Sequence, residues 1–485
     1  MVDVLVIGGG NAGFTAALAA AERGRSVVLL EKANEDRAGG NSYYTAGATR
    51  IPHDGFNDIA DFIEYDERHA ATEVPPYTAN DYLADLEKVS NGRNDPELSR
   101  VLVDESHTTL RWLQQQGLKY RLMYERQAYS RPDGSFLFWG GLHIGNVGGG
   151  KGLMEDHKAA AARAGITVHY GHAATGLLNE DGKITGASYR TDDGGAGEVR
   201  AESVILASGG FEANPEMRQR YLGEGWQNAK VRGTPGNTGE MIVAALDTGA
   251  ATGGDWSTCH SVAWDAGFED NESNFELTNQ LTRGGYPLGI VVNRNGERFV
   301  DEGADFRNYT YARYGRDILN QPGSVAFQLF DATTRPMLRS EEYDMPGVSV
   351  LTADTLPDLA KLAGIDEVVL QRTVSGYNAG IDQTKTFDPN IKDGRAAAVE
   401  PRKSNWALAL DTAPFYAFPV TCGVTFTFGG LKTDTHGRVL SADGSPVPGL
   451  LACGEALGGL FSGNYPGGSG LAAGAVFGRR AGSIA

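Results

Sequence analysis

The sequence predicts an α/β fold that begins with a Rossmann-like nucleotide-binding unit. Residues 4–7 (VLVI) form a short, fully apolar run of the kind found in a buried parallel strand. An alanine-rich helical stretch, residues 14–23, follows, and a second apolar run, residues 26–30, ends at Glu31. Strand, glycine-rich turn, helix, strand and acid therefore occur in the order expected of a dinucleotide-binding unit.

The turn after the first strand has the pattern G-x-G-x-x-G at residues 8–13. Gly8 allows a tight turn, Gly10 lets the backbone reach a pyrophosphate, and Gly13 lets helix and strand pack closely. The helix N-terminus offers unpaired N–H groups to the phosphates, and Glu31 is predicted to accept hydrogen bonds from the adenosine ribose. The alternative interpretation of residues 8–13 is a flexible loop. The accompanying strands, helix and acid favour the nucleotide-binding interpretation over it.

Further glycine-rich segments favour FAD over NAD as the cofactor. Residues 39–42 (GGNS) and 45–47 (TAG) follow the second strand, and residues 454–455 (GE) and 467–471 (GGSGL) lie near the C-terminus. Each segment by itself is compatible with a simple turn. Together they predict a long cofactor contacted by both ends of the chain, which suits FAD.

Composition and charge exclude several classes of partner. The chain has 485 residues, a formal net charge of −18 and a pI near 5.0. Nucleic acids and anionic membrane surfaces require concentrated lysine and arginine, so neither is an expected partner. An acidic substrate would need a local cluster of arginines.

The cysteines and the apolar runs predict a cytoplasmic protein without metal or membrane insertion. Cys259, Cys422 and Cys453 lie far apart and form no C-x-x-C pair. No stretch approaches the ~18 apolar residues of a membrane span.

The sequence resembles the flavoprotein family of fumarate reductases, succinate dehydrogenases and 3-ketosteroid dehydrogenases. The matching stretches occur in family order along nearly the whole chain, at residues 8–13, 39–42, 207–211, 236–240, 296–302, 428–431 and 454–455. The resemblance implies a discontinuous, Rossmann-like FAD-binding domain interrupted by an α+β capping domain. With the segments above, the predicted cofactor-binding residues are Gly8, Gly10, Asn11, Ala12, Gly13, Glu31, Lys32, Gly39, Gly40, Asn41, Ser42, Ala46, Gly47, Ala174, Ala207, Ser208, Gly209, Asn237, Glu240, Gly454, Glu455, Ser469, Gly470 and Leu471.

The expected domain bounds are residues 1–255 for the first part of the FAD-binding domain, 256–415 for the cap and 416–485 for the return segment. A partly helical insertion is expected at 57–148, and a hairpin turn at 179–183. In the cap, residues 290–293 are predicted as a strand, and residues 355–361 and 366–377 as helices.

The family resemblance also implies catalytic residues. Arg307 occupies a position similar to the arginine that transfers the proton in fumarate reductases, while the flavin N5 transfers the hydride. A guanidinium is a poor base, so Arg307 is expected to act through neighbouring carboxylates or to lose its proton briefly in a dry site. The alternative is an arginine that only clamps a carboxylate. His260 lies where the family keeps a substrate-binding histidine, although a single histidine is often structural.

Two departures from the family pattern make a fumarate- or succinate-specific site doubtful. Thr425 stands where the dicarboxylate enzymes carry a histidine, and Tyr465 stands where they carry an arginine. Tyr465 resembles the tyrosine that ketosteroid dehydrogenases place at the substrate, and a packed aromatic side chain is the alternative. Both residues are predicted catalytic residues.

Other cations are candidates for holding substrate carboxylates, because arginine pairs with them bidentately. Of Arg50, Arg131, Arg283 and Arg313, the two selected are Arg283, which precedes two glycines, and Arg131, in a Pro-Asp-Gly turn. Gly468 is also predicted to bind substrate. No histidine lies in residues 39–47, where succinate dehydrogenases tether FAD, so non-covalent FAD is expected.

Residues 303–311, 421–430 and 463–469 resemble the tricarballylate dehydrogenase subgroup. The preferred hypothesis is an enzyme that oxidises tricarballylate to cis-aconitate and passes electrons to a separate protein or quinone. The alternatives are an enzyme like 3-ketosteroid dehydrogenase or fumarate reductase, and a flavin-binding protein without a redox substrate of its own.

Overall fold

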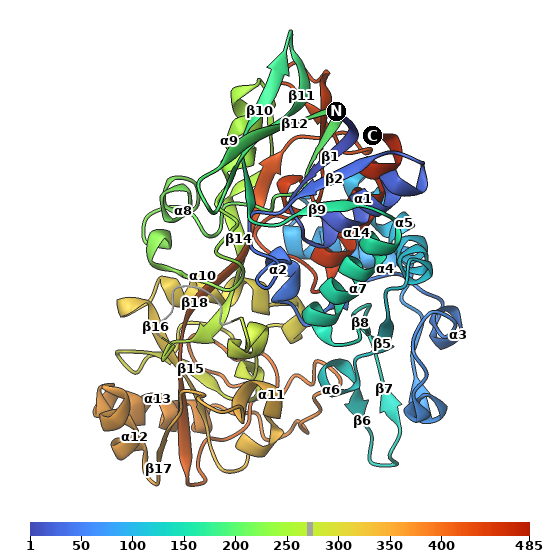
Figure 1. Cartoon of the computed structure of the whole chain (residues 1–485). Coiled ribbons are helices and arrows are strands. Elements are labelled where there is room, and N and C mark those ends of the chain that lie inside the picture. The colour runs from blue at the N-terminus through green and yellow to red at the C-terminus, as the bar shows by residue number, and fades with distance from the viewer. Residues whose placement is uncertain (269–274) are drawn as a thin grey trace. The chain divides into compact units, whose positions relative to one another are not determined.

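The computed structural model describes residues 1–268 and 275–485 and is a mixed α/β structure, as predicted (Figure 1). Its described residues divide into two compact units. Unit 1 comprises Met1–Gly223, Gly233–Cys259 and Phe426–Ala485, and unit 2 comprises Glu224–Arg232 and His260–Thr425.

Two of the places where the chain passes between the units fall within strands, and the two that bound Glu224–Arg232 fall in loops. Strand β14 (Thr252–Asp265) and strand β18 (Phe415–Leu431) each contain a change-over, at residues 259/260 and 425/426. The sequence-based bounds, 255/256 and 415/416, lie near the beginnings of these strands. The short segment Glu224–Arg232 was not assigned to the cap from sequence. The domain bounds themselves stay a prediction.

Unit 1 contains the predicted nucleotide-binding sheet. Strand β1 pairs in parallel with β2 and β12, β2 with β9, and β12 with β20. The antiparallel strands β10, β11 and β12 extend the sheet, with the predicted hairpin turn between Glu180 and Lys183. The strands are β1 (Val2–Ile7), β2 (Val27–Leu30), β9 (Thr167–His169), β10 (His172–Glu180), β11 (Lys183–Thr191), β12 (Ala196–Leu206), β19 (Arg438–Leu440) and β20 (Pro446–Ala452).

Helix α1 (Asn11–Glu22) packs against the C-terminal helix α14 (Ser469–Ile484), so the two ends of the chain meet (Figure 1). Glycines on α14 permit this closeness: a Cβ on Gly478 would lie 2.5 Å from the Ala12 oxygen, and one on Gly482 2.1 Å from the Ala16 oxygen. Larger side chains on this face of α14 would push the helices apart.

The predicted insertion at residues 57–148 contains helices and two small sheets. Helix α4 begins with a capping box at Thr78 and Asp81, and α5 begins after Asp95, which caps two backbone N–H groups. The remaining helices of unit 1 are α2 (Gly40–Tyr43), α3 (Phe56–Ile59), α4 (Ala79–Ser90), α5 (Pro96–Gln115), α6 (Tyr124–Gln127), α7 (Gly149–Arg163), α8 (Pro215–Leu222) and α9 (Glu240–Asp247). The small sheets contain β3 (Ala48–Thr49), β8 (Ile144–Asn146) and β5 (Tyr120–Leu122), and β4 (Thr72–Glu73), β7 (Phe136–Leu137) and β6 (Tyr129–Ser130).

Unit 2 is built on a second sheet whose long strand is β18. Strands β16 and β17 pair antiparallel with β18, β15 pairs with β16, and β13 pairs with β18 in parallel. Apolar side chains of α12 and α13, such as Leu359 and Leu370, share a core with Ile290 and Leu329 of the sheet. The elements are β13 (Lys230–Val231), β15 (Ile290–Asn293), β16 (Val325–Phe330), β17 (Leu351–Ala353), α10 (Tyr314–Leu319), α11 (Ser340–Tyr343), α12 (Leu356–Ala363) and α13 (Glu367–Ala379). The predicted strand at 290–293 is confirmed, and so are the two predicted helices.

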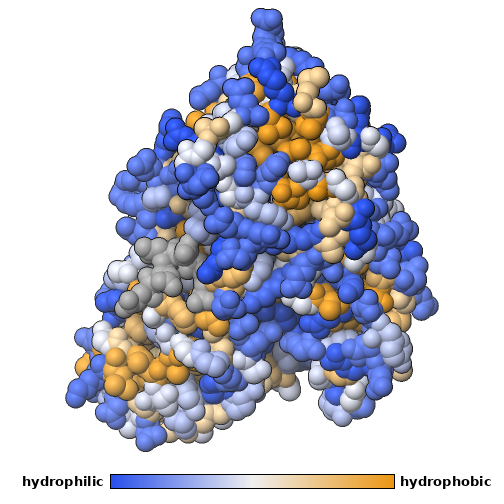
Figure 2. Space-filling model, viewed as in Figure 1, coloured by the Kyte–Doolittle hydropathy of each residue, from blue (hydrophilic) through white to orange (hydrophobic). Residues whose placement is uncertain are grey.

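The surface in Figure 2 is largely hydrophilic, with hydrophobic side chains in separate patches. In the part of the chain that the structure describes, no helix combines the length and the apolar character needed to cross a bilayer.

Candidate functional site

The turn between β1 and α1 requires glycine at two positions. Gly8 has a φ of +109°, and a Cβ there would lie 2.3 Å from the Ala207 oxygen. A Cβ on Gly13 would lie 1.9 Å from the Gly8 oxygen. Gly10 differs, because a Cβ added there would have Ser42 Oγ, at 3.5 Å, as its nearest neighbour. The free space at Gly10 adjoins the N-terminus of α1, as a phosphate site requires.

The first turn of α1 leaves backbone donors for a ligand. Gly10, at the N-cap, has no side chain to accept from them. Ser42 Oγ accepts the Asn11 N–H at 3.0 Å, which ties the second predicted segment to the turn. Asn11 Nδ2 donates to the Leu471 carbonyl at 2.9 Å. Segments from both ends of the chain therefore converge on one turn.

Glu31 directly follows strand β2 and carries a buried carboxyl group. Its Oε2 accepts the Gly9 N–H at 2.6 Å, and its Oε1 accepts the Ala33 N–H at 2.8 Å. Burial raises the pKa of Glu31, while these two hydrogen bonds act in the opposite direction. Carboxylate oxygens have several lone pairs, so Glu31 retains the capacity to accept ribose hydroxyls.

A second group of predicted cofactor residues surrounds the end of β12. Asn41 Oδ1 accepts the Thr234 N–H at 2.9 Å. Thr427 donates to Glu455 Oε1 from its backbone at 2.7 Å and from its hydroxyl at 3.0 Å. A Cβ on Gly209 would lie 2.3 Å from Asn237 Nδ2, so the backbone after β12 must approach these polar groups closely.

The remaining predicted cofactor residues differ in exposure. Lys32 forms a half-exposed ion pair with Glu240 at 3.0 Å, and Lys32 Nζ also donates to Thr238 Oγ1 at 2.8 Å. Gly47 has a φ of +74° and packs against Gly149. The others are placed in unit 1 by these same segments: Ala12 and Gly13 on α1, Gly39, Gly40 and Ala46 around α2, Ala174 on β10, Ala207 and Ser208 after β12, Gly454 after β20, and Ser469, Gly470 and Leu471 on α14. Their cofactor contacts stay predictions.

In unit 2, two predicted catalytic residues lie beside an arginine that the sequence analysis missed. The parallel pair Val231↔Val424 brings Arg232 next to Thr425, and Arg232 Nη1 donates to Thr425 Oγ1 at 3.0 Å. His260 is 1% exposed, and both burial and the charge of Arg232 hold its pKa well below the usual range. Arg232 lies far from both residues in sequence, so only the strand pairing reveals it.

Arg307 is paired with a buried carboxylate. It begins a short 3-10 helix, Arg307–Tyr309, and its Nη1 lies 3.2 Å from Glu342 Oε1. Glu342 is 1% exposed, accepts the Gly284 N–H at 3.0 Å, and has Arg339 Nη1 at 3.6 Å. Glu342, on α11, was not identified from sequence, and it supplies the kind of neighbouring carboxylate that Arg307 was expected to need.

Arg283 is held inside unit 2 by a buried ion pair. Its Nη2 lies 2.6 Å from Asp265 Oδ2, both side chains have no exposed surface, and Nη1 donates to the Gln280 carbonyl at 2.8 Å. Its predicted role in substrate binding stays a prediction.

Replacing Arg283 with methionine is expected to lower the free energy of unfolding by about 3–5 kcal/mol, because Asp265 is left as a buried charge without its partner. Urea denaturation measures this. Arg372, an exposed arginine on α13, provides the matched control, and Arg372→Met is expected to change the free energy of unfolding by less than about 0.5 kcal/mol. A loss in Arg283→Met as small as in the control would contradict the structural role.

The predicted site residues of unit 1 lie in different surroundings. Tyr465 is buried against Phe426 and Phe461, with ring centroids at 5.1 and 5.5 Å. A Cβ on Gly468 would lie 2.3 Å from a Leu142 methyl group. Arg131 forms an ion pair with Glu73 at 2.7 Å, with both side chains well exposed. Their roles with substrate stay predictions.

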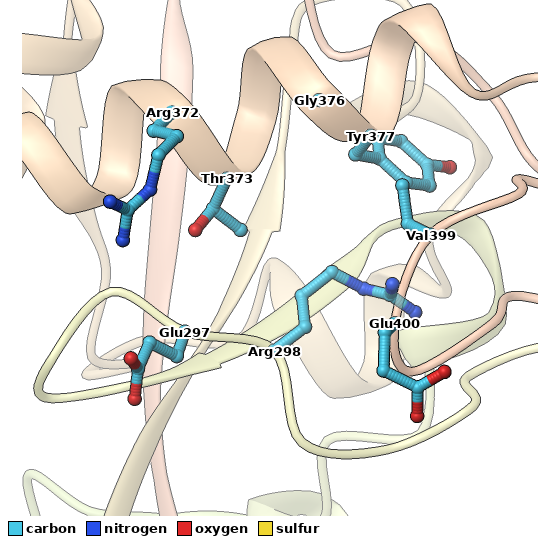
Figure 3. A pocket seen from close by; sticks show the side chains of 8 residues that line it. All are labelled: Glu297, Arg298, Arg372, Thr373, Gly376, Tyr377, Val399 and Glu400. Carbon is cyan, nitrogen blue, oxygen red and sulfur yellow. The ribbon is translucent and has the colours of Figure 1, made fainter.

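Unit 2 also contains a cavity of about 410 Å³ that none of the predicted site residues lines (Figure 3). Arg372 and Thr373 reach into it from α13, and Glu297 and Arg298 from the loop after β15. Arg298 is already paired with Glu302. This cavity is therefore separate from the groups described above.

Comparison with known proteins identifies the family. A family model described as an FAD binding domain matches residues 3–471. The chain belongs to this family. It is 30% identical over 490 residues to a fumarate reductase (cytochrome) of Shewanella frigidimarina, covering 100% of this chain and 77% of that protein.

Two solved structures share the fold. One is a flavocytochrome c3 fumarate reductase in an open conformation, with a TM-score of 0.74, 27% identity and coverage of 99% of this chain and 77% of that one. The other is the 3-ketosteroid Δ1-dehydrogenase of Sterolibacterium denitrificans, with a TM-score of 0.77, 20% identity and coverage of 100% and 99%.

The predicted family and fold class are confirmed: a Rossmann-like, discontinuous FAD-binding domain with an inserted α+β capping domain. The chain is an FAD-dependent oxidoreductase acting on CH–CH groups. The free space at Gly10, the open donors of α1 and the acceptor Glu31 fit the pyrophosphate and ribose of FAD. The hypothesis of a flavin protein without a redox substrate is therefore set aside.

Proposed function

We propose that this enzyme dehydrogenates a C–C bond of a small polycarboxylate, and that tricarballylate, oxidised to cis-aconitate, is its substrate. The observation that carries the proposal is the cationic group of unit 2, in which Arg232 lies with Thr425 and His260. Guanidinium groups match planar carboxylates, and a neutral histidine and a hydroxyl add uncharged hydrogen bonds. A chain with a net charge of −18 needs such a local cation to attract an acidic substrate.

Dehydrogenation removes a hydride from one carbon and a proton from its neighbour. FAD, when bound, would supply the acceptor for the hydride. The proton passes from the substrate carbon to Arg307 as that guanidinium gives its own proton to Glu342, the buried carboxylate 3.2 Å away. A second cation, Arg339, lies near the same oxygen, with its Nη1 3.6 Å from Glu342 Oε1. The reverse order of proton movements serves reduction.

The test of the substrate is anaerobic reduction of the holoenzyme. Tricarballylate is expected to bleach the flavin absorbance and to yield cis-aconitate, identified by chromatography, whereas a 3-ketosteroid is expected to leave the spectrum unchanged. Bleaching by the ketosteroid alone would remove the proposal.

Replacing Arg232 with methionine is expected to reduce kcat/KM for tricarballylate by about thirtyfold or more. Loss of one partner from a desolvated charge pair costs about 2–5 kcal/mol, and each 1.36 kcal/mol corresponds to about tenfold. Arg232→Lys keeps the positive charge but loses the planar guanidinium, so its kcat/KM should lie between those of Arg232→Met and the wild type. Steady-state kinetics measure this, with Arg372→Met as the control. An unchanged kcat/KM in Arg232→Met would refute the role of Arg232.

A second candidate function, 3-ketosteroid dehydrogenation, is favoured by one observation. Tyr465 lies among Phe426 and Phe461, which gives unit 1 an aromatic cluster with one hydroxyl. Such a cluster suits an apolar ligand with a single carbonyl. The bleaching experiment separates the two functions.

FAD is proposed to bind without a covalent link, and its electrons to pass to a separate protein or quinone. Residues 39–47 contain no histidine to tether the flavin. Acid precipitation of the yellow holoenzyme is therefore expected to release all flavin into the supernatant. Flavin that stays with the precipitated protein would contradict this.

A further inference from the structure

Two carboxyl groups, the buried Glu212 and the partly buried Glu455, adjoin each other in unit 1. Asn237 Nδ2 lies 2.7 Å from Glu212 Oε1 and 3.5 Å from Glu455 Oε2, so a single amide nitrogen adjoins both groups. Glu212 has no exposed surface. A Cβ on Gly210 would lie 2.1 Å from Glu455 Oε1, which shows how closely the backbone covers the pair.

Each carboxyl group has one oxygen well supplied with donors. Glu212 Oε1 accepts from Asn41 Nδ2 at 2.5 Å and from Asn237 Nδ2. Glu455 Oε1 accepts both donors of Thr427. Among the described residues, the buried Glu212 Oε2 can receive a hydrogen bond only from a protonated Glu455. Over the same residues, Glu455 Oε2 has only the 3.5 Å contact with Asn237 Nδ2. The two poorly supplied oxygens belong to the two neighbouring acids.

Two ionised carboxylates in this arrangement would repel each other, because each is an acceptor only. A proton on one of them converts the repulsion into a hydrogen bond. Burial raises the pKa of both groups, and the charge of Glu212 raises that of Glu455 further. Two side-chain amides stabilise the charged form of Glu212. The charged neighbour from another element is Arg218 on α8, whose guanidinium donates to the backbone carbonyl of Glu212.

We infer that Glu212 and Glu455 share one proton, and that Glu212 is a positioning residue that keeps Glu455 neutral where FAD binds. The inference rests on the proposed contact of Gly454 and Glu455 with FAD. With one proton, the pair carries a single negative charge. When the pH rises through the raised pKa of Glu455 and that proton is lost, a second negative charge repels the pyrophosphate and FAD binding weakens.

Infrared spectroscopy of the protein at neutral pH tests the shared proton directly. The wild type is expected to show the carbonyl band of a protonated, buried carboxylic acid, and Glu455→Gln is expected to lack it. The apoprotein is expected to show the band as well, so this result is independent of FAD binding and of activity. A wild-type spectrum without the acid band overturns the inference.

The pH dependence of FAD binding tests the positioning role. In the wild type, the Kd for FAD is expected to rise by up to about tenfold per pH unit above the raised pKa of Glu455. Glu455→Gln carries a permanently neutral group and should have a flat profile, and Glu212→Gln should move the rise to lower pH. Asp317→Asn, which removes another carboxyl with a raised pKa in unit 2, should leave the wild-type profile. An unchanged profile in Glu455→Gln refutes the inference.

If a variant does not bind FAD, the pH dependence of its free energy of unfolding still tests the inference. Because the folded pKa of Glu455 is raised, its contribution to stability is complete below the unfolded value near 4.5 and is lost as the pH rises through the folded pKa. Urea unfolding of the apoprotein should show this fall in the wild type and a smaller fall in Glu455→Gln. Equal falls in the two proteins count against the shared proton. Failure of tricarballylate to reduce the flavin would refute the proposed substrate and leave these results unaffected.

Discussion

Replacing Arg307 with glutamine is expected to slow substrate-driven flavin reduction by about 10²–10⁴-fold, the range that general acid–base catalysis contributes. In the proposed mechanism the guanidinium carries the proton between the substrate carbon and Glu342, and glutamine cannot carry it. Anaerobic stopped-flow spectroscopy with tricarballylate measures the rate. FAD content should equal that of the wild type, because Arg307 lies in unit 2 and the predicted FAD residues lie in unit 1.

Two further variants make this result specific. Glu342→Gln keeps the size of the side chain and removes the basic oxygen, so it should reduce the rate as strongly as Arg307→Gln. Arg313→Gln removes a partly exposed arginine from the next 3-10 helix and should keep the wild-type rate. If either Arg307→Gln or Glu342→Gln reduced the flavin at the wild-type rate, the proton would have to take another route.

Replacing Gly10 with alanine is expected to weaken FAD binding by about a hundredfold or more while leaving the apoprotein folded. A Cβ at Gly10 meets no atom closer than 3.5 Å, so the protein itself tolerates it. The methyl group would occupy space expected for the pyrophosphate and would cost hydrogen bonds to charged oxygens, worth about 1.5–3 kcal/mol each. Fluorescence titration with FAD measures the affinity, and thermal unfolding of the apoprotein measures the fold.

Gly13→Ala provides the contrast within the same turn. Its Cβ would lie 1.9 Å from the Gly8 oxygen, so this variant should lose about 1–3 kcal/mol of stability even without FAD. Gly376 is a helical glycine, and an added Cβ there would meet no neighbour within 4 Å. Gly376→Ala should therefore keep both the FAD affinity and the stability of the wild type. If Gly10→Ala binds FAD as the wild type does, the assigned pyrophosphate site is wrong.

The candidate cofactor site could be predicted from sequence because its chemistry is local. The turn at residues 8–13 requires glycine for steric reasons that hold wherever a strand feeds a helix in this way, and Glu31 follows at a fixed distance. Of the residues proposed to act on the substrate, only some could be named from the sequence. Arg307 and His260 followed from the resemblance to a family, whereas Arg232 and Glu342 carry no local pattern. An isolated arginine or glutamate in sequence is usually a solvated surface residue.

The sequence by itself determined the α/β class and the nucleotide-binding turn, and it led to the expectation that any acidic substrate would meet a local cluster of cations. Only the tertiary structure decided which charged groups become partners. The register of β13 on β18 brings Arg232 to Thr425, Arg283 is committed to Asp265, and α11 supplies Glu342 to Arg307. The reason is that electrostatic and hydrogen-bonding energies depend on distances of a few ångströms and on burial. Those quantities are set by strand register and helix packing between segments far apart in the chain.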